Sequence, residues 1–124
     1  MSQAEDNQTS REIVAEGAVR DVGWNTPVLV VNRGPNAGFR FPLYDGITTA
    51  GRDPRSDIFL EDVTVSRHHA EFRLGRGELQ VVDVGGLNGT YVNGQLIDSA
   101  VLTGGDEIQI GKFRLVLLIP PATG

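Results

Sequence analysis

The chain of 124 residues contains no cysteine. This absence excludes disulfide bonds, thiolate catalysis and zinc–cysteine sites, and it favours a cytoplasmic protein. The sequence also has no apolar run near the roughly 18 residues of a membrane span. Its N-terminus has no basic segment followed by an apolar one, which a secretory signal would need. We therefore expect a cytoplasmic protein that has no membrane partner.

Positive charge is scarce as well. The chain has 11 Lys and Arg residues against 16 Asp and Glu residues, which gives a net charge of −5 with neutral histidines. A nucleic-acid surface needs clustered positive charge, so this balance argues against nucleic acid as a partner. Aromatic residues make up only 6% of the chain and leave few platforms for base stacking. Any anion-binding site must therefore be local.

The sequence changes in character near residue 27. Residues 1–26 are polar and acidic with no sustained apolar period, which predicts a disordered tail. From residue 27 to 120, short apolar or alternating runs are separated by turn residues about every ten positions, as in a β-sandwich. Asn93-Gly94 is typical of a two-residue hairpin turn. We predict an all-β fold, a single antiparallel β-sandwich over residues 27–120, with a flexible N-terminal tail and a flexible C-terminus at 121–124.

The segments between the predicted strands carry no recognisable catalytic motif. Gly111-Lys112 lacks the other residues of a phosphate-binding loop. His68 and His69 are adjacent at a strand start, where successive side chains point to opposite faces, so one metal ion could not easily bind both. Ser66, His69 and Asp83 have the residue types of a triad, but no nucleophile elbow or oxyanion loop accompanies them. We expect no enzymatic activity, no metal and no cofactor.

Hydrogen-bond donors gather at three predicted strand ends. They lie in the segments Gly51-Arg52, Thr64-Val65-Ser66-Arg67-His68-His69 and Leu87-Asn88-Gly89-Thr90. If these segments converge, two guanidinium groups, hydroxyl groups and an amide form a pocket suited to a phosphate dianion, because arginine binds phosphate oxygens bidentately. The alternative is that each arginine is a solvated surface charge.

The order and spacing of four motifs resemble the forkhead-associated (FHA) domain family. The motifs are Gly51-Arg52, Ser66-Arg67-His68-His69, Asn88-Gly89-Thr90 and Gly105-Asp106. The resemblance covers about residues 28 to 119, and it extends to the small bacterial regulators of the glycogen accumulation regulator type. It implies an eleven-stranded β-sandwich over the predicted domain, residues 27–120, whose loops at one end bind phosphothreonine peptides.

The resemblance also implies roles for individual residues. The phosphate would be bound directly by Arg52 and Ser66, with assistance from Arg67 and Thr64. Asn88 would hold the peptide backbone, and Leu87 would lie near the bound peptide. Four further residues would support the site structurally, namely Gly51, His69, Gly89 and Thr90.

The chain departs from the family pattern in three places. Gly86 stands where the family often has serine, and His68 stands where the closest regulators usually have a second arginine. Those regulators also carry tandem tail threonines whose phosphorylation lets the tail occupy its own pocket. The nearest counterpart here offers Thr9 and Ser10 as phosphorylation sites, and only Ser10 has an apolar residue three positions on. Self-inhibition by the tail is therefore a hypothesis.

These observations predict a phosphothreonine-peptide-binding signalling module that acts in Ser/Thr-kinase-dependent regulation. The expected partners are phosphothreonine-containing proteins, namely a Ser/Thr protein kinase and its targets among enzymes of central carbon and nitrogen metabolism. We expect the chain to be a monomer. The alternative function is that of a structural β-sandwich which binds its partners independently of phosphorylation.

Overall fold

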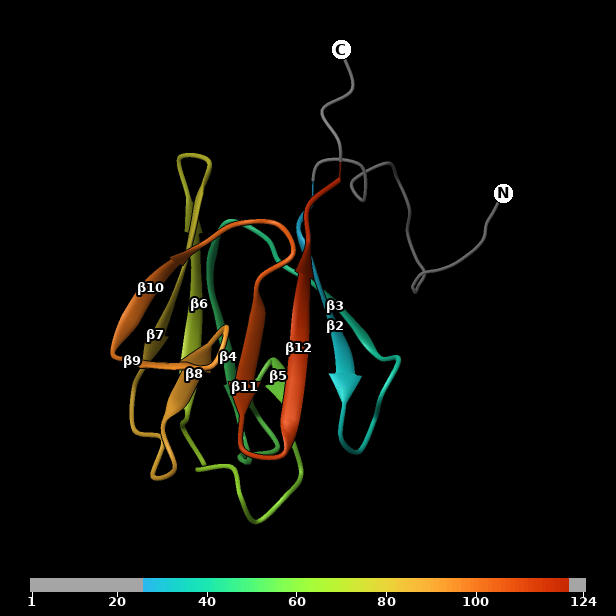
Figure 1. Cartoon of the computed structure of the whole chain (residues 1–124), viewed down its shortest axis with the longest axis vertical. Helices are drawn as coiled ribbons and strands as arrows, with labels where there is room; N and C mark the ends of the chain where they lie inside the picture. The colour runs from blue at the N-terminus through green and yellow to red at the C-terminus, as the bar shows by residue number, and fades with distance from the viewer. Residues whose placement is uncertain (1–25, 121–124) are drawn as a thin grey trace. The chain divides into compact units, whose positions relative to one another are not determined.

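The computed structural model describes residues 26–120, in which eleven strands form two sheets (Figure 1). The five-stranded sheet has, in spatial order, β10 (Ser99–Leu102), β7 (Glu78–Asp83), β6 (Ala70–Gly75), β4 (Gly46–Gly51) and β5 (Ile58–Phe59). The six-stranded sheet has β3 (Arg40–Pro42), β2 (Val28–Arg33), β12 (Phe113–Leu118), β11 (Glu107–Ile110), β8 (Thr90–Val92) and β9 (Gln95–Ile97). The prediction of an all-β sandwich is confirmed.

Neighbouring strands are antiparallel at every pairing except one. The exception is β4 with β5, which pair in parallel through Ala50 with Ile58 and Gly51 with Phe59. A parallel neighbour needs a crossover connection rather than a tight turn. Residues 52–57 make that connection, and Arg52 is its first residue, directly after the end of β4.

Alternating side chains build the core between the sheets. In β12, Phe113, Leu115 and Leu117 are fully buried, while the residues between them are partly exposed. This pattern follows from the two-residue period of a strand, which directs alternate side chains to one face. Burying one such side chain contributes about 1.5–3 kcal/mol. The buried face of each strand therefore fixes its register and the positions of the loops.

The hairpin between β8 and β9 has the predicted turn. Asn93 and Gly94 have φ angles of 50° and 84°. A type I′ turn requires positive φ at both central residues, which asparagine and glycine tolerate. The strands on either side pair with Val92 opposite Gln95.

Four connections meet at the lower end of the sandwich in Figure 1: residues 52–57, 60–69, 84–89 and 111–112. Hydrogen bonds join residues 60–69 to each of the other three connections. The three donor segments identified in the sequence all lie in or next to these connections, at this end of the sandwich.

Residues 27–119 form one compact unit. No helix long and apolar enough to cross a membrane occurs in residues 26–120. The predicted N-terminal tail up to residue 25, the C-terminal residues 121–124 and the candidate phosphorylation sites Thr9 and Ser10 lie outside the described residues.

Candidate functional site

A buried histidine holds the loop that precedes β6. His69 is fully buried, and its Nδ1 accepts a hydrogen bond from the backbone N–H of Ser66 at 3.1 Å. Its Nε2 lies 2.9 Å from the carbonyl oxygen of Gly89. Because Nδ1 accepts this hydrogen bond, Nε2 carries a ring proton and donates to the carbonyl oxygen of Gly89. The imidazole therefore ties the Ser66 loop to the loop that precedes β8.

The end of β4 lies against the same loop. The backbone N–H of Arg52 donates to the carbonyl oxygen of Ser66, and its Nε donates to that of Val65, both at 2.9 Å. A Cβ on Gly51 would lie 2.0 Å from the carbonyl oxygen of Arg67, so only glycine fits there. The Arg52 side chain is exposed, and its two Nη groups have no hydrogen-bond partner among residues 26–120.

Two hydrogen bonds join the loops of Ser66 and Asn88. The N–H of Leu87 donates to Ser66 Oγ at 2.8 Å, which leaves the hydroxyl hydrogen of Ser66 available to another acceptor. Asn88 Nδ2 donates to the carbonyl oxygen of Thr64 at 3.1 Å, which leaves its side-chain oxygen as an acceptor. The Leu87 side chain is 91% exposed. The loop pair thus presents two donors, namely the Ser66 hydroxyl and the second Nδ2 hydrogen of Asn88, together with one acceptor and one apolar side chain.

Thr64 lies in the same loop, but its hydroxyl is fully engaged. It donates to Asp62 Oδ2 and accepts from the backbone N–H of Lys112 at 2.9 Å. A Cβ on Gly111 would lie 2.4 Å from Thr64 Oγ1, so the turn between β11 and β12 packs closely on this residue. Thr64 therefore anchors the loop to that turn and has no hydroxyl hydrogen left for a ligand.

Asp83 orders the loop between β7 and β8. Its Oδ1 accepts the N–H groups of Gly85 and Gly86 at 3.0 and 3.1 Å, and its Oδ2 accepts the hydroxyl of the buried Thr90 at 2.7 Å. Burial raises the pKa of Asp83, but these hydrogen bonds outweigh it, and the net pKa lies below the ordinary value. A Cβ on Gly86 would lie 2.2 Å from Nε2 of His69, so the glycine at this departure from the family pattern makes room for the ring.

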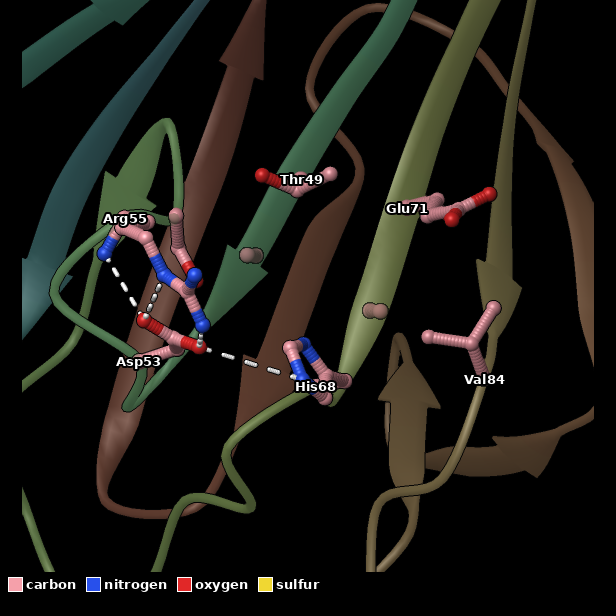
Figure 2. A pocket seen from close by; sticks show the side chains of 9 residues that line it. Thr49, Asp53, Arg55, His68, Glu71 and Val84 are labelled. Atoms are coloured by element: carbon pink, nitrogen blue, oxygen red, sulfur yellow. Dashed lines mark hydrogen bonds and ion pairs between the residues drawn. The ribbon is translucent and has the colours of Figure 1, made fainter.

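Asp53 is a charged residue of this region that the sequence does not single out. Its side chain is 3% exposed, and its Oδ1 accepts the backbone N–H of Arg55 at 2.9 Å and Arg55 Nε at 3.3 Å. Its Oδ2 accepts Arg67 Nη2 at 3.2 Å. It also accepts Arg55 Nη2 at 3.1 Å, and His68 Nε2 lies 3.8 Å away (Figure 2). The hydrogen bonds from Arg55 above all hold the pKa of Asp53 well below its usual range. Asp-Pro-Arg predicts a turn, but nothing local predicts the ion pair with Arg67, 14 residues away.

A pocket of about 200 Å³ lies beside Asp53, against the neighbouring strands β4 and β6 near the loop end (Figure 2). Its lining includes Asp53, Arg55, His68, Glu71 and Val84, but neither Arg52 nor Ser66. With two carboxylates and one guanidinium group in the lining, the pocket is a poor site for an anion.

The predicted residues 51–52, 64–69 and 87–90 therefore lie together at one end of the sandwich. Within residues 26–120, the donors there that remain free are the Arg52 Nη groups, the Ser66 hydroxyl, the exposed part of Arg67 and the second Nδ2 hydrogen of Asn88. Such a set suits an anion with several oxygens, because guanidinium and hydroxyl groups satisfy different oxygens. Among the described residues, no three His, Cys, Asp or Glu side chains are grouped so that they could hold a metal ion.

Known proteins resemble this chain over the segments that carry the candidate site. The sequence profile of the FHA domain matches residues 48–111, a range that includes all three donor segments. The glycogen accumulation regulator GarA of Mycolicibacterium smegmatis is 66% identical over 109 residues, covering 86% of this chain and 69% of that protein. GarA of Mycobacterium tuberculosis is 69% identical over 97 residues, which cover 78% of this chain and 60% of that protein. The oxoglutarate dehydrogenase inhibitor of Corynebacterium efficiens is 70% identical over 95 residues, 77% of this chain and 67% of that protein.

Solved structures agree on the fold. A structure from an analysis of phosphothreonine-dependent FHA domain interactions has a TM-score of 0.73 at 28% identity, and covers 78% of this chain and 99% of that one. EmbR of Mycobacterium tuberculosis in complex with a low-affinity phosphopeptide has a TM-score of 0.71 at 28% identity. That match covers 80% of this chain and 26% of EmbR.

Proposed function

The chain belongs to the FHA domain family, and we propose that it is a signalling module that binds phosphothreonine peptides at the loop end carrying Arg52, Ser66 and Arg67. One observation gives the strongest support for binding at this end of the sandwich. The backbone hydrogen bond from Arg52 to Ser66 brings a guanidinium group with free Nη donors beside a hydroxyl with a free hydrogen.

The chemistry of this pair matches a phosphate dianion. A phosphothreonine carries about −1.5 to −2 charges at neutral pH and three acceptor oxygens. Arg52 and Ser66 bind these oxygens directly, and Arg67 adds a third donor group. Each hydrogen bond to a charged group contributes about 1.5–3 kcal/mol. Micromolar affinity, about −8 kcal/mol, is therefore within reach of this small set.

The peptide on either side of the phosphate meets the loop before β8. Asn88 accepts a backbone N–H of the peptide through its side-chain oxygen, while one hydrogen of its Nδ2 bonds the carbonyl oxygen of Thr64 and fixes the orientation of the amide. Leu87 offers an exposed apolar contact. Gly51, His69, Gly89 and Thr90 support these residues from behind, and Thr64 joins them as a supporting residue.

The relatives suggest which proteins carry the phosphothreonine. Regulators and inhibitors of metabolism are prominent among them, which supports binding partners among phosphorylated enzymes that handle 2-oxoglutarate and the Ser/Thr kinase upstream of them. The chain acts by binding such partners as a monomer and catalyses no reaction of its own.

A degenerate peptide library tests this function. Fluorescein-labelled nonapeptides with a central phosphothreonine and randomised flanks are titrated with the full chain, and the same library with threonine serves as the control. We expect saturable binding of the phosphothreonine library alone. Equal binding of both libraries would instead support the alternative, a sandwich that recognises partners independently of phosphorylation.

A further inference from the structure

Arg67 follows the proposed phosphate ligand Ser66 directly, but in this structure its guanidinium group binds a carboxylate. Arg67 Nη2 donates to Asp53 Oδ2 at 3.2 Å, and the guanidinium has no other hydrogen bond among the described residues. The side chain is 55% exposed, whereas that of Asp53 is 3% exposed. Among the described residues, a single hydrogen bond, to the buried carboxylate of Asp53, thus holds the Arg67 guanidinium group.

Asp53 does not depend on Arg67 for its own neutralisation. Arg55 reaches both carboxylate oxygens, with its backbone N–H and Nε on Oδ1 and its Nη2 on Oδ2. Removing one partner of a buried ion pair is normally costly because it leaves a bare charge. Here Arg55 remains in place when Arg67 leaves, so the departure of Arg67 leaves no bare carboxylate.

We propose that Asp53 and the bound phosphate compete for Arg67. Without ligand, Asp53 holds Arg67; when a phosphothreonine binds, Arg67 transfers to a phosphate oxygen while Arg55 continues to neutralise Asp53. Asp53 is then a positioning residue that limits affinity for phosphate. This inference rests on the proposed function. It adds Asp53, which touches no ligand but controls whether Arg67 is available to the phosphate.

The charges around Asp53 favour the transfer of Arg67 from Asp53 to the phosphate, rather than the binding of a second anion beside Asp53. The nearest groups are Arg55, Arg67 and His68, and all three are already directed at the one carboxylate. The low pKa of Asp53 keeps this carboxylate ionised at neutral pH, so competition for Arg67 persists in ordinary solution conditions.

A double-mutant cycle tests the exchange. The library with central phosphothreonine is titrated against the full chain and its variants Asp53→Asn, Arg67→Ala and the double variant. Asp57→Asn is the matched control, because Asp57 lies on the same connection and loses the same charge, but it bonds Thr49 and no arginine.

We expect Asp53→Asn to raise affinity by about threefold or more when Arg67 is present, and by clearly less when Arg67 is alanine, as contacting residues show coupling of this size. Equal gains in both backgrounds would mean that Asp53 acts only as a distant charge, and would overturn the exchange. A loss of affinity in Asp53→Asn would overturn it too. If the unmodified chain does not bind the library, the proposed function fails, and the exchange fails with it.

A second measurement needs no substitution at Asp53 and covers the case in which that variant misfolds. The ¹⁵N guanidinium signals of Arg67, assigned with Arg67→Lys, are followed while doubly blocked phosphothreonine is added. We expect the Arg67 signals to move most on binding, and those of Arg55 to move less, because Arg55 keeps its hydrogen bonds to Asp53. Binding that leaves Arg67 unmoved contradicts the exchange without contradicting the proposed function.

Discussion

Arg52 and Thr64 are polar residues of the same loop end, yet their hydrogen bonds give them different roles. Among residues 26–120, Arg52 donates only through Nε and its backbone N–H, so its outer nitrogens can bind a ligand. Thr64 uses both functions of its hydroxyl on Asp62 and Lys112. Residue type and spacing predicted both as ligands. The sequence could not reveal how Thr64 is engaged, because Lys112 is 48 positions away.

Replacing Arg52 tests the ligand role. Arg52→Ala removes charge-assisted bonds worth about 1.5–3 kcal/mol, so we expect affinity for the phosphothreonine library to fall by about 10- to 100-fold. The melting temperature should fall by only a few degrees, because the side chain is exposed and loses one hydrogen bond within the protein, from Nε to the carbonyl oxygen of Val65. Arg40→Ala on the edge strand β3 removes an equal charge from an exposed arginine and serves as the control. Equal losses in both variants would point to net charge rather than to a site.

Replacing Thr64 tests the supporting role. Thr64→Val strands the N–H of Lys112 and removes a donor to Asp62, which costs about 1–3 kcal/mol of folding stability. Thr64→Ser keeps the hydroxyl and is expected to stay near the parent stability. Chemical denaturation of the two variants measures the difference. If Thr64→Val proves as stable as the parent but binds phosphopeptide poorly, Thr64 is a ligand and the supporting role is wrong.

At the scale of elements, the two-residue period predicted most strands, but it could not predict how they pair. β4 and β5 pair in parallel, although nothing in a short run such as Ile58–Phe59 specifies direction. The connections were predicted as turns from their Gly, Pro, Asn and Asp content. Their hydrogen bonds to one another join residues distant in sequence, and these bonds emerge only in the fold.

The loop between β7 and β8 depends on an ionised Asp83. Since its folded pKa lies below the unfolded value of about 3.9, Asp83 contributes stability above that value, and the contribution is lost as pH falls through the folded pKa. Asp83→Asn should therefore lower stability at pH 7 and flatten its decline in acid. Thermal unfolding between pH 7 and pH 2 measures both effects. If the variant loses stability between pH 7 and pH 2 as steeply as the parent, ionised Asp83 does not contribute to stability.

The two adjacent histidines offer a matched comparison within one element. His69 is fully buried and bonds two loops, whereas the His68 side chain is 72% exposed. His69→Ala leaves a cavity and an unpaired carbonyl, so we expect a loss of roughly 2–5 kcal/mol and weaker phosphopeptide binding. His68→Ala should change stability by less than about 0.5 kcal/mol, as at most surface positions. Denaturant titration of the pair would contradict this account if the two losses were similar.

At the scale of the whole molecule, charge is distributed unevenly. The chain is acidic, with a net charge of −5, yet Arg52, Arg55 and Arg67 lie at the same loop end, where Arg55 and Arg67 bind one buried carboxylate and Arg52 bonds the loop of Ser66. Composition alone argues against a surface that binds a polyanion such as nucleic acid, but it is compatible with one local anion-binding site. An acidic body with a small cationic site favours a single phosphate in a peptide over a nucleic acid.

The tail hypothesis belongs to this scale and still rests on sequence alone. If a Ser/Thr kinase modifies Ser10 or Thr9, the phosphorylated tail should compete with the phosphothreonine library and reduce its apparent affinity. Mass spectrometry locates the modification, and the variant with alanine at both positions is the control. A tail that the kinase leaves unmodified, or whose modification does not alter library binding, excludes self-inhibition.

The most direct test of the central claim is an amide NMR titration of the full chain with one library-selected phosphothreonine peptide. We expect the largest shifts in residues 51–55, 64–69 and 86–90, and none of them with the unphosphorylated peptide. Shifts that cluster at the opposite end, around residues 75–77 and 103–106, or that persist without the phosphate, would contradict the assignment of phosphothreonine binding to this site.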